Sequence, residues 1–571
     1  MLDAGGQYCH LIARKIRDLG VYAEVRPSDT PAGELASARG IVISGGPSSV
    51  YDPASPRVDP AIFNSGRPIL GICYGQQIIA HLLGGEVRPG DKGEYGLAAL
   101  ELDPASDPLF GGLAGEQQVW MSHRDQVASP PPGFSVAGRT ATCAVAAIAA
   151  PERGIYGVQF HPEVVHTARG REYLSNFVFR VCGARQDWDP RHRVPLLEQE
   201  IRECVAGRNV FFFVSGGVDS TVAFTLCLRS LGEDRVRGVY VDTGLMREGE
   251  TDFVRRMPGI AVEHAADQFL TALAGVTDPE RKRHIIGEEF VRVQEAIVEE
   301  RSLADERWIL GQGTIYPDTI ESGGTANAAV IKTHHNRVAG IQRLIESGRI
   351  VEPLKSFYKD EVREVGRELG LPAELLERHP FPGPGLAIRC LCSEFDAPVR
   401  ATAEGFIIPV NSVGVQGDSR SYAPVLAIES TDHERATALI NRIAGINRVI
   451  AGVRTRLPVA EMQVRACSLT PERIARLRRA DATVRRLSHG SGFDASVWQF
   501  PVILIPLGTV AEAPDSVVLR PVDSVDGMTA RSVPIEPELL ERICAELLQQ
   551  EGIAGVFLDL THKPPGTIEW E

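Results

Sequence analysis

The stretch GICYGQQ, Gly71 to Gln77, places one cysteine between two glycines. Apolar residues 68–70 precede it, so we expect a strand to end at Ile72 and a helix to begin near Tyr74. Glycines on both sides permit the tight turn that exposes a nucleophile in a G-x-S-x-G elbow. A helix N-terminus also stabilises a thiolate, which makes a cysteine reactive near neutral pH. The spacing therefore makes Cys73 a candidate nucleophile.

A thiolate nucleophile needs a base, and the stretch GVQFHPEV supplies His161 and Glu163. In extended chain, residues i and i+2 point to the same side, so Glu163 can hold the imidazole of His161 in one tautomer. The segment SGGP, Ser44 to Pro47, ends another apolar run and offers backbone N–H groups for an oxyanion hole. A cysteine alone is most often a buried packing residue. The three motifs together indicate a thiol acyl-transfer site.

A second motif, SGGVDS, Ser215 to Ser220, lies between a strand-like run and a helical run. Backbone N–H groups and hydroxyls converge on an anion at such a turn. The motif has no lysine after its glycines, so it is a poor match to the P-loop of enzymes that transfer a γ-phosphate. A turn that binds no ligand is the alternative for the hexapeptide alone.

The motifs Gly-x-Cys-x-Gly-x-Gln, Ser-Gly-Gly-Pro and His-Pro-Glu resemble those of the class I glutamine amidotransferases. In that family the cysteine attacks the side-chain amide of glutamine and releases ammonia for a partner domain. The resemblance implies that Cys73, His161 and Glu163 are catalytic. It also implies that Gly46 and Tyr74 are the oxyanion donors.

The motif SGGVDS resembles the loop of the N-type ATP pyrophosphatases, which cleave ATP to AMP and pyrophosphate while adenylating a substrate oxygen. That superfamily has several substrates, so the loop alone does not fix one. The segments VDTGLMREGE, GQGTIYPDTIES, IKTHHN, EPLKSFYKDEVRE, RHPFPGPGLAIR and KPPGTIEWE resemble, in this order, those of the GMP synthetases. This resemblance covers nearly the whole chain.

The resemblance to GMP synthetases implies three further groups of site residues. The ATP-binding group comprises Ser215, Gly216, Gly217, Val218, Asp219, Ser220, Asp242 and Lys332, and Asp219 also helps to hold magnesium. The XMP-binding group comprises Pro317, Arg420, Arg520, Lys563, Thr567 and Glu569. The lid group comprises Asp318, Glu321, His334, His335 and Lys355. Ordinary surface positions are the alternative for Lys332, Lys355 and Arg420.

The implied reaction has two halves. Glutamine is hydrolysed through a thioester on Cys73, while the O2 atom of XMP attacks the α-phosphate of Mg-ATP to give adenyl-XMP and pyrophosphate. Ammonia then displaces AMP at C2 and yields GMP. Because free ammonia would be wasted, we expect the segment 316–336 to close over the nucleotide.

The expected cofactor is Mg²⁺, bound with ATP. Zinc is not expected, because the adjacent side chains of His334 and His335 diverge and no further ligand lies at suitable spacing. The expected partners are glutamine, ATP and XMP as small-molecule substrates, with no nucleic acid and no membrane. The chain is expected to be a monomer or a homodimer.

Length and composition fit this reading. At 571 residues the chain is too long for one core, and its formal charge of −14 opposes general binding to nucleic acid. No apolar run reaches the length of a membrane span, and the start MLDAGGQY has no secretory pattern. Relatives carry apolar residues before this aspartate, so the natural start is expected upstream. Ten scattered cysteines favour a reducing compartment, and we expect a cytoplasmic protein.

The predicted fold class is α/β, with three domains. Residues 1–185 are expected to form a class I glutamine amidotransferase domain with a parallel sheet, and residues 195–385 an ATP pyrophosphatase domain with another. The segment 183–195 is the expected linker between them. Residues 386–571 change to an α+β pattern and are expected to form the C-terminal dimerisation and XMP-binding domain.

The C-terminal part contains a weak internal repeat, since GINRVIAGVRTR from Gly445 resembles GIAGVFLDLTHK from Gly552. Chance similarity is the alternative. This part is longer than in the short form of the family, so we expect the long form, with the dimerisation module duplicated. A duplicated module could mimic the dimer contact within one chain, which favours a monomer.

One departure from the family pattern concerns the glutamine pocket. Arg124 stands in SHRDQV where the family usually has glycine.

Two rival readings are another amidotransferase-linked adenylating enzyme, such as an NAD synthetase, and a binding protein that has kept the fold and lost the chemistry. The first does not explain KPPGTIEWE, and the intact Cys73, His161 and Glu163 oppose the second.

Overall fold

The computed structural model describes residues 1–6, 8–47, 49–103, 108–113, 116–164, 166–321, 343–345, 347–416, 419–509, 512–524 and 530–571. For residues 90–93, 319–321, 415–416 and 419–420 it describes the backbone only. The chain folds into two compact units, Met1–Pro190 and Arg191–Glu571. The division falls inside the segment 183–195. The two regions that were predicted as separate domains after it form a single unit.

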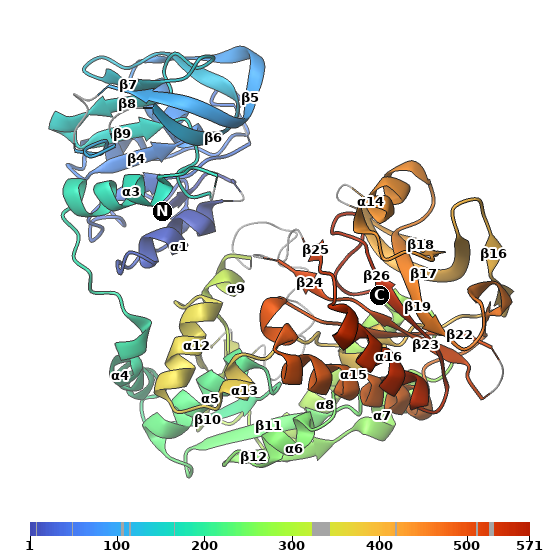
Figure 1. Ribbon diagram of the computed structural model, residues 1–571. Helices are drawn as coiled ribbons and strands as arrows, with labels where there is room; N and C mark the ends of the chain where they lie inside the picture. Colours follow the sequence, from blue (N-terminus) through green and yellow to red (C-terminus); the bar gives the residue numbers. More distant parts are fainter. Residues whose placement is uncertain are drawn as a thin grey trace. The chain divides into compact units, whose positions relative to one another are not determined.

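The first unit is built on a nine-stranded sheet in the order β2-β1-β3-β4-β9-β8-β7-β5-β6. Figure 1 labels the strands β4 to β9 of this sheet. Its strands are β1 (Leu2–Asp3), β2 (Arg26–Pro27), β3 (Ile41–Ile43), β4 (Ile69–Ile72), β5 (Glu86–Leu102), β6 (Glu116–Ser129), β7 (Ser135–Arg139), β8 (Ala147–Ala150) and β9 (Ile155–Val158). Its α-helices are α1 (Cys9–Arg17), α2 (Tyr74–Leu82) and α3 (Gly170–Ser175). Helix α2 follows β4 directly and packs against β3, β4 and β9.

Only half of this sheet is parallel, which differs from the predicted parallel sheet. The pairs from β2 through β1, β3 and β4 to β9 are parallel, whereas the pairs from β9 through β8, β7 and β5 to β6 are antiparallel. The connection from β8 to β9 is a short 3-10 turn, Pro151–Arg153, closed by Gly154 at φ 65°. So short a connection permits only antiparallel pairing, because a parallel crossover needs a dozen or more residues.

The second unit begins with a five-stranded, fully parallel sheet in the order β12-β11-β10-β13-β14. Its strands are β10 (Asn209–Phe213), β11 (Val236–Asp242), β12 (Ile260–His264), β13 (Trp308–Gly311) and β14 (Ile350–Val351). The accompanying helices are α4 (Val194–Val205), α5 (Val218–Leu231), α6 (Glu250–Arg255), α7 (Ala266–Ala272), α8 (Pro279–Glu300), α9 (Tyr316–Glu321), α12 (Lys359–Glu368) and α13 (Ala373–Leu376). The strand order reverses between β10 and β13, and sheets of this kind bind ligands at the carboxyl ends of the strands at such a point.

The C-terminal part of the second unit contains a seven-stranded sheet in the order β16-β17-β18-β19-β26-β23-β21. Its strands are β16 (Arg400–Ala401), β17 (Phe406–Gln416), β18 (Ser419–Ile428), β19 (Arg448–Thr455), β21 (Val502–Ile505), β23 (Asp515–Leu519) and β26 (Ile553–Asp559). Its α-helices are α14 (His433–Arg442), α15 (Pro471–Ser491) and α16 (Pro537–Gln549). Small sheets join β15 (Ala397–Pro398), β20 (Gln463–Val464) and β22 (Leu507–Gly508), and also β24 (Val522–Asp523) and β25 (Arg531–Ser532).

The two halves of the seven-stranded sheet follow the same course. In each half an antiparallel pair, β17–β18 or β21–β23, is followed by a helix, α14 or α16. A strand parallel to the second member of the pair then follows, which is β19 in one half and β26 in the other. Strands β19 and β26 pair antiparallel at the centre of the sheet, so the two halves meet there.

A buried ion cluster anchors the end of the chain to this sheet. Asp559, the last residue of β26, lies 2.9 Å from Arg448 and 2.6 Å from Arg520, and none of the three side chains is exposed. The indole nitrogen of Trp570 donates to the same carboxylate at 2.9 Å. Breaking a buried ion pair commonly costs about 3–5 kcal/mol. The cluster therefore fixes the terminal motif KPPGTIEWE against β26.

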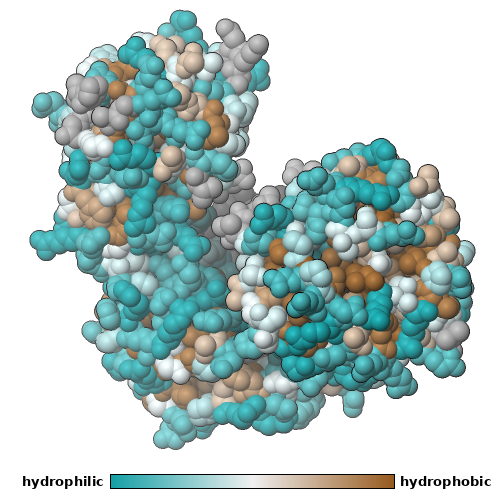
Figure 2. Space-filling view, viewed as in Figure 1, coloured by the Kyte–Doolittle hydropathy of each residue, from teal (hydrophilic) through white to brown (hydrophobic). Residues whose placement is uncertain are grey.

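On the face shown in Figure 2, hydrophilic residues predominate and hydrophobic residues form separate groups. Large hydrophobic side chains that are exposed include Tyr95 and Leu97 on β5, and Phe395 near β15. Exposed apolar residues at scattered positions are normal for a globular protein.

Candidate active sites

The first candidate site is centred on Cys73, which lies between β4 and α2. Its backbone adopts φ 52° and ψ −106°, a conformation that a residue with a side chain rarely takes. A Cβ atom at Gly75 would lie 2.3 Å from the carbonyl oxygen of Ile43, so only glycine lets helix α2 approach the sheet this closely. The strained turn and the close approach are the features of a nucleophile elbow.

The thiol of Cys73 is enclosed by polar groups from two other strands. Gln159, just after β9, donates from Nε2 to Sγ at 3.6 Å, and Sγ lies 3.7 Å from the carbonyl oxygen of Ser122 on β6. The side chain of Gln77 on α2 contacts Gln159 at 3.4 Å. The sequence analysis singled out neither Ser122 nor Gln159. The position of Gln159 two residues before His161 is the signal that could have identified it.

His161 and Glu163 form the predicted pair. The distance between Nδ1 of His161 and Oε1 of Glu163 is 2.6 Å, and the two residues are only 5% and 1% exposed. Burial alone would lower the pKa of His161, but hydrogen bonds to Cys73 and Glu163 outweigh burial and raise it to about 10. His161 therefore carries a proton at neutral pH and faces the cysteine as an imidazolium.

The predicted oxyanion donors lie beside this turn. Tyr74 is the first residue of α2, where backbone N–H groups have no partner within the helix. A Cβ atom at Gly46 would lie 2.3 Å from the carbonyl oxygen of Ala4 and 3.3 Å from the ring of Tyr74. The absence of a side chain at Gly46 therefore lets its backbone come close to Tyr74. Arg124, on β6, is exposed.

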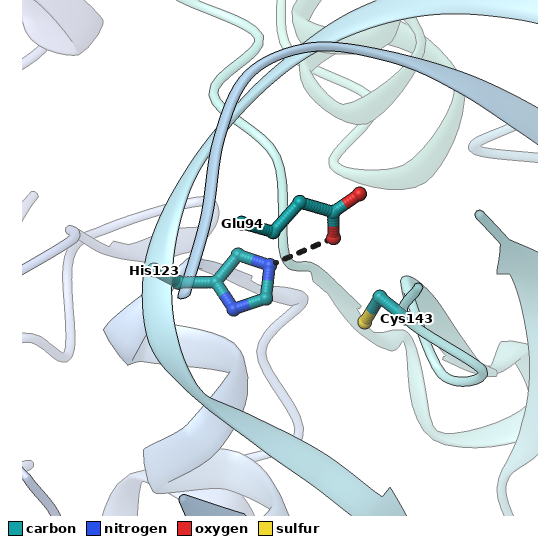
Figure 3. A group of neighbouring side chains, drawn as sticks. All are labelled: Glu94, His123 and Cys143. Atoms are coloured by element: carbon teal, nitrogen blue, oxygen red, sulfur yellow. Dashed lines mark ion pairs between the residues drawn. The ribbon is translucent and has the colours of Figure 1, made fainter. Parts of the chain in front are cut away.

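His123, one residue after Ser122 on β6, forms a cluster with Glu94 on β5 and Cys143 (Figure 3), and the potential ligand atoms of the three residues all lie within 4.8 Å of one another. Nδ1 of His123 must carry a proton, because it lies 3.1 Å from the carbonyl oxygen of Asp125, which can only accept. Nε2 of His123 then faces Glu94 at 3.3 Å, and Thr140 donates to the other carboxylate oxygen at 3.0 Å. Neither Nε2 of His123 nor the facing Oε2 of Glu94 has a hydrogen-bond partner among the described residues, and the residue types of the cluster can bind zinc. The expectation of no zinc stays a prediction.

We expect Glu163→Gln to reduce kcat/KM for glutamine hydrolysis by about 10²–10⁴-fold, since a glutamine amide can donate to Nδ1 and favour the wrong tautomer of His161. The imidazolium must protonate the departing ammonia, so activity falls as pH rises through the raised pKa of His161 near 10. Without the Glu163 charge this pKa falls, and the alkaline limb should move to lower pH. The check is glutamate release by wild type and variant between about pH 6 and pH 11. An unmoved alkaline limb in the variant would show that Glu163 does not set the charge of His161.

The second candidate site is the turn between β10 and α5, at the point where the strand order reverses. Oγ of Ser215 and Oγ of Ser220 lie 2.9 Å apart, and Gly216 has φ 75°. A Cβ atom at Gly313, in the loop after β13, would lie 2.7 Å from the backbone of Ser220. The two loops at the carboxyl ends of β10 and β13 therefore pack directly against each other, and the turn presents the N-terminus of a 14-residue helix.

Asp219, at the start of α5, has one carboxylate oxygen that is available to bind a cation. Its Oδ2 accepts from Nζ of Lys359 at 2.6 Å, and its Oδ1 is buried without a hydrogen-bond partner among the described residues. Burial raises the pKa of Asp219, with Lys359 acting against it and Asp318 acting with it. A buried oxygen without a partner and a second carboxylate nearby fit Mg²⁺, which prefers oxygen ligands.

The remaining predicted nucleotide-binding residues occupy several places. Asp242 ends β11 and accepts from the backbone N–H of Gly244 at 3.0 Å. Pro317 and Asp318 lie on α9, and Lys355 is exposed. Lys332, His334 and His335, together with the side chains of Glu321 and Arg420, lie outside the described residues.

The terminal motif has partners that the sequence did not predict. Both carboxylate oxygens of Glu569 accept from Arg389, at 2.6 and 2.8 Å. The hydroxyl of Thr567 donates to the carbonyl oxygen of Val413 at 3.0 Å, and the backbone of Lys563 pairs with Ala530. The motif is therefore tied to the segment RHPFPGPGLAIR and to β17.

Arg520, predicted as a phosphate ligand, is buried and bonded to the protein on three sides. It is not exposed, it pairs with Asp559, and it donates to the carbonyl oxygens of Ile568 and Thr561 at 3.0 Å. Nη2 of Arg520 is buried without a hydrogen-bond partner among the described residues, and the role of Arg520 as a phosphate ligand stays a prediction.

Two other arginines line a pocket at the carboxyl end of β11. Arg247 and Arg478 contribute to its wall together with Asp242 and Thr251. Arg247 pairs with Asp481 at 3.4 Å and stacks over the ring of Phe381 at 4.3 Å. The sequence analysis quoted VDTGLMREGE but did not single out Arg247. The presence of an arginine in this motif, which follows the next strand after the Ser215–Ser220 turn, was the available signal.

Comparison with known proteins gives matches over the whole chain. The profile of the family described as glutamine amidotransferase class-I matches residues 1–181, and that of the GMP synthase C terminal domain matches residues 487–570. A probable glutamine-hydrolyzing GMP synthase of Leptospira interrogans is 42% identical, and the match covers 100% of this chain and 99% of that protein. Glutamine-hydrolyzing GMP synthases of Thermomicrobium roseum and Symbiobacterium thermophilum are 40% and 41% identical and are covered over 96% and 98% of their lengths.

Proposed function

Because the chain belongs to the glutamine-hydrolyzing GMP synthase family and makes GMP from XMP with glutamine as nitrogen donor, we propose that its two compact units divide this reaction between them. The first unit releases ammonia from glutamine at Cys73. The second unit uses ATP to activate XMP and joins it to that ammonia. The observation that carries the division is that the cysteine elbow and the phosphate-binding turn belong to different units.

In the first unit, the thiolate of Cys73 attacks the side-chain amide of glutamine. The hydrogen bond of 2.6 Å to Glu163 holds His161 so that its other ring nitrogen is left for Cys73. The imidazolium then gives its proton to the leaving ammonia, and His161 becomes the base that activates water for hydrolysis of the thioester. The backbone N–H groups of Gly46 and Tyr74 stabilise the oxyanion.

In the second unit, the turn Ser215–Ser220 holds the ATP phosphates through backbone N–H groups, two hydroxyls and the N-terminus of α5. Asp219 would hold magnesium through its buried Oδ1, with Asp318 close by. Bound magnesium would neutralise negative charge on the phosphates. Lys359 then keeps one oxygen of Asp219 paired while the other remains available.

We place the XMP site at the terminal motif. Lys563, Thr567 and Glu569 lie in a segment that Arg389 and the Asp559 cluster hold in one conformation. Lys563 supplies positive charge to the phosphate, and Glu569 accepts hydrogen bonds. We further propose that Pro317 and Arg420 bind XMP. The segment 316–336 is proposed to close over the nucleotide.

The C-terminal region is proposed to be a duplicated module, as in the long form of the family. The support is the repeated course of hairpin, helix and parallel strand on either side of the β19–β26 pair. The β19–β26 contact joins two equivalent halves, as the contact in a two-fold symmetric dimer does. We therefore propose that the protein is a monomer and not a homodimer. Sedimentation velocity distinguishes these two states.

A cytoplasmic location is supported by the ten cysteines, all of which are free.

The proposal is tested by assaying the purified protein with XMP and Mg-ATP, and with either glutamine or ammonium chloride as the nitrogen donor. GMP should form with both donors, and glutamate should be released only from glutamine. Glutamine hydrolysis without GMP formation from either donor would overturn the assignment of XMP as the acceptor.

A further inference from the structure

Three side chains of the first unit bring potential metal ligands together: Glu94 on β5, His123 on β6 and Cys143 in the loop between β7 and β8 (Figure 3). A carboxylate oxygen, an imidazole nitrogen and a sulfur all lie within 4.8 Å of one another. Two ligand atoms on a tetrahedral zinc ion lie about 3.3–3.5 Å apart. Oε2 of Glu94 and Nε2 of His123 already lie 3.3 Å apart. The spacing of the cluster is therefore close to that of a zinc site.

The contact between His123 and Glu94 is not a hydrogen bond. Nδ1 of His123 carries its proton toward the carbonyl oxygen of Asp125, so a neutral ring has only a lone pair at Nε2. Neither Nε2 nor the facing Oε2 of Glu94 has a hydrogen-bond partner among the described residues, although both atoms are buried. His123 is only 7% exposed, and buried polar atoms are normally paired. A cation held by both atoms would satisfy them.

Each of the three residues is also held by a further contact. Metal-binding histidines commonly donate their other ring N–H to a backbone carbonyl, as Nδ1 of His123 does to Asp125. Thr140 donates to Oε1 of Glu94 at 3.0 Å, which leaves Oε2 for an ion. The backbone N–H of Cys143 donates to the same threonine hydroxyl at 3.0 Å, and its carbonyl oxygen accepts from the Thr140 N–H at 2.9 Å. Thr140 therefore positions both Glu94 and Cys143.

We propose that Glu94, His123 and Cys143 form a zinc-binding site in the first unit. Zn²⁺ would be bound by Oε2 of Glu94, Nε2 of His123 and Sγ of Cys143, with a water molecule as the fourth ligand. The bond from sulfur to zinc replaces the S–H bond of Cys143, and the released proton goes to solvent.

The ligand types select the ion. Imidazole and thiolate ligands favour zinc, whereas magnesium and calcium prefer oxygen ligands. One carboxylate and one thiolate balance the two positive charges of Zn²⁺, so the filled site buries no net charge. Zinc at this cluster would replace the expectation of no zinc, which was argued from His334 and His335.

The cluster has a route for the ion and adjoins the nucleophile. The side chain of Glu94 is 16% exposed and Cys143 is not exposed, so the ion would enter past Glu94. His123 directly follows Ser122, whose carbonyl oxygen lies 3.7 Å from Sγ of Cys73. Bound zinc would therefore tie β5, β6 and the loop at Cys143 together and steady a backbone group that contacts the thiol.

The test uses the full chain with Cys73→Ala, so that the nucleophile cannot bind the metal. Co²⁺ is the probe, since a thiolate bound to cobalt gives a sulfur-to-metal charge-transfer band in the near ultraviolet. The protein is reduced and freed of metal with a chelator, and Co²⁺ is then titrated. The band should saturate at one Co²⁺ per chain, and Zn²⁺ should compete for the site.

Three further changes in the Cys73→Ala chain decide the assignment. Cys143→Ser should abolish the band, whereas Cys182→Ser, which removes a half-buried thiol from the same unit, should leave it unchanged. Thr140→Val keeps all three ligands but removes the hydroxyl that positions them, so it should weaken Co²⁺ binding by about 10–100-fold. Absence of the band in Cys73→Ala, or its persistence in Cys143→Ser, would overturn the proposal.

Thermal unfolding gives a second readout that also shows whether each variant is folded. Zn²⁺ should raise the unfolding temperature of the first unit by several degrees relative to chelator in Cys73→Ala and in its Cys182→Ser derivative. Its Cys143→Ser derivative should unfold cooperatively in chelator and show no rise with Zn²⁺. An equal rise in the Cys143→Ser derivative would place the zinc elsewhere and contradict the site.

Discussion

The variant Cys73→Ala is expected to lose GMP formation from glutamine by at least roughly 10³-fold and to keep GMP formation from ammonium. Alanine has no nucleophile in place of the thiol, the neighbouring Gln159 side chain is an amide, and the raised pKa of His161 keeps its imidazole protonated. The turn Ser215–Ser220, which we propose binds the ATP phosphates, belongs to the other compact unit, so its chemistry does not need the cysteine. The measurement is the rate of GMP formation with each donor.

The control for this variant is Cys182→Ala, which removes a half-buried thiol from the same unit and should preserve both rates. Loss of the ammonium-dependent rate in Cys73→Ala, with intact folding by circular dichroism, would contradict the division of the reaction between the two units.

The variant Asp219→Asn is expected to lose GMP formation with both donors, by about 10²–10³-fold, while glutamine hydrolysis continues. The change removes the charge that would hold magnesium at Oδ1 and leaves Lys359 without its partner at 2.6 Å. Glutamate release and GMP formation are measured in the same reaction. Raising the magnesium concentration should recover part of the lost rate.

Asp234→Asn is the control for this variant, because Asp234 is an exposed carboxylate in the same unit and lies away from the turn. If Asp219→Asn reduced glutamine hydrolysis alone and left the ammonium-dependent rate unchanged, Asp219 would not belong to the ATP site.

Much of the first site could be predicted because it is local in sequence. The turn at Cys73 follows from two glycines between a strand and a helix, and the pair His161–Glu163 follows from the alternation of extended chain. The contacts of Ser122 and Gln159 with the thiol depend on which strands lie next to each other in the sheet. No local pattern contains that information.

The second unit shows a different limit. The turn Ser215–Ser220 could be recognised from its residues, and the relatives confirm the prediction that the chain is a GMP synthetase. A charged residue in a motif does not reveal whether it is buried, however. Arg520 pairs with Asp559 in the interior, and Arg389 holds Glu569 from a segment about 180 positions earlier in the chain. The antiparallel half of the first sheet was missed because the residues of a strand do not show the direction of its neighbours in the sheet.

The most direct test of the account uses XMP labelled with ¹⁸O at O2, together with Mg-ATP and glutamine, and follows the oxygen by mass spectrometry. If the second unit adenylates XMP at O2 and ammonia then displaces AMP, the AMP that is formed should contain the label and the pyrophosphate should not. Unlabelled AMP formed together with GMP would contradict the adenyl-XMP intermediate and with it the proposed role of the second unit.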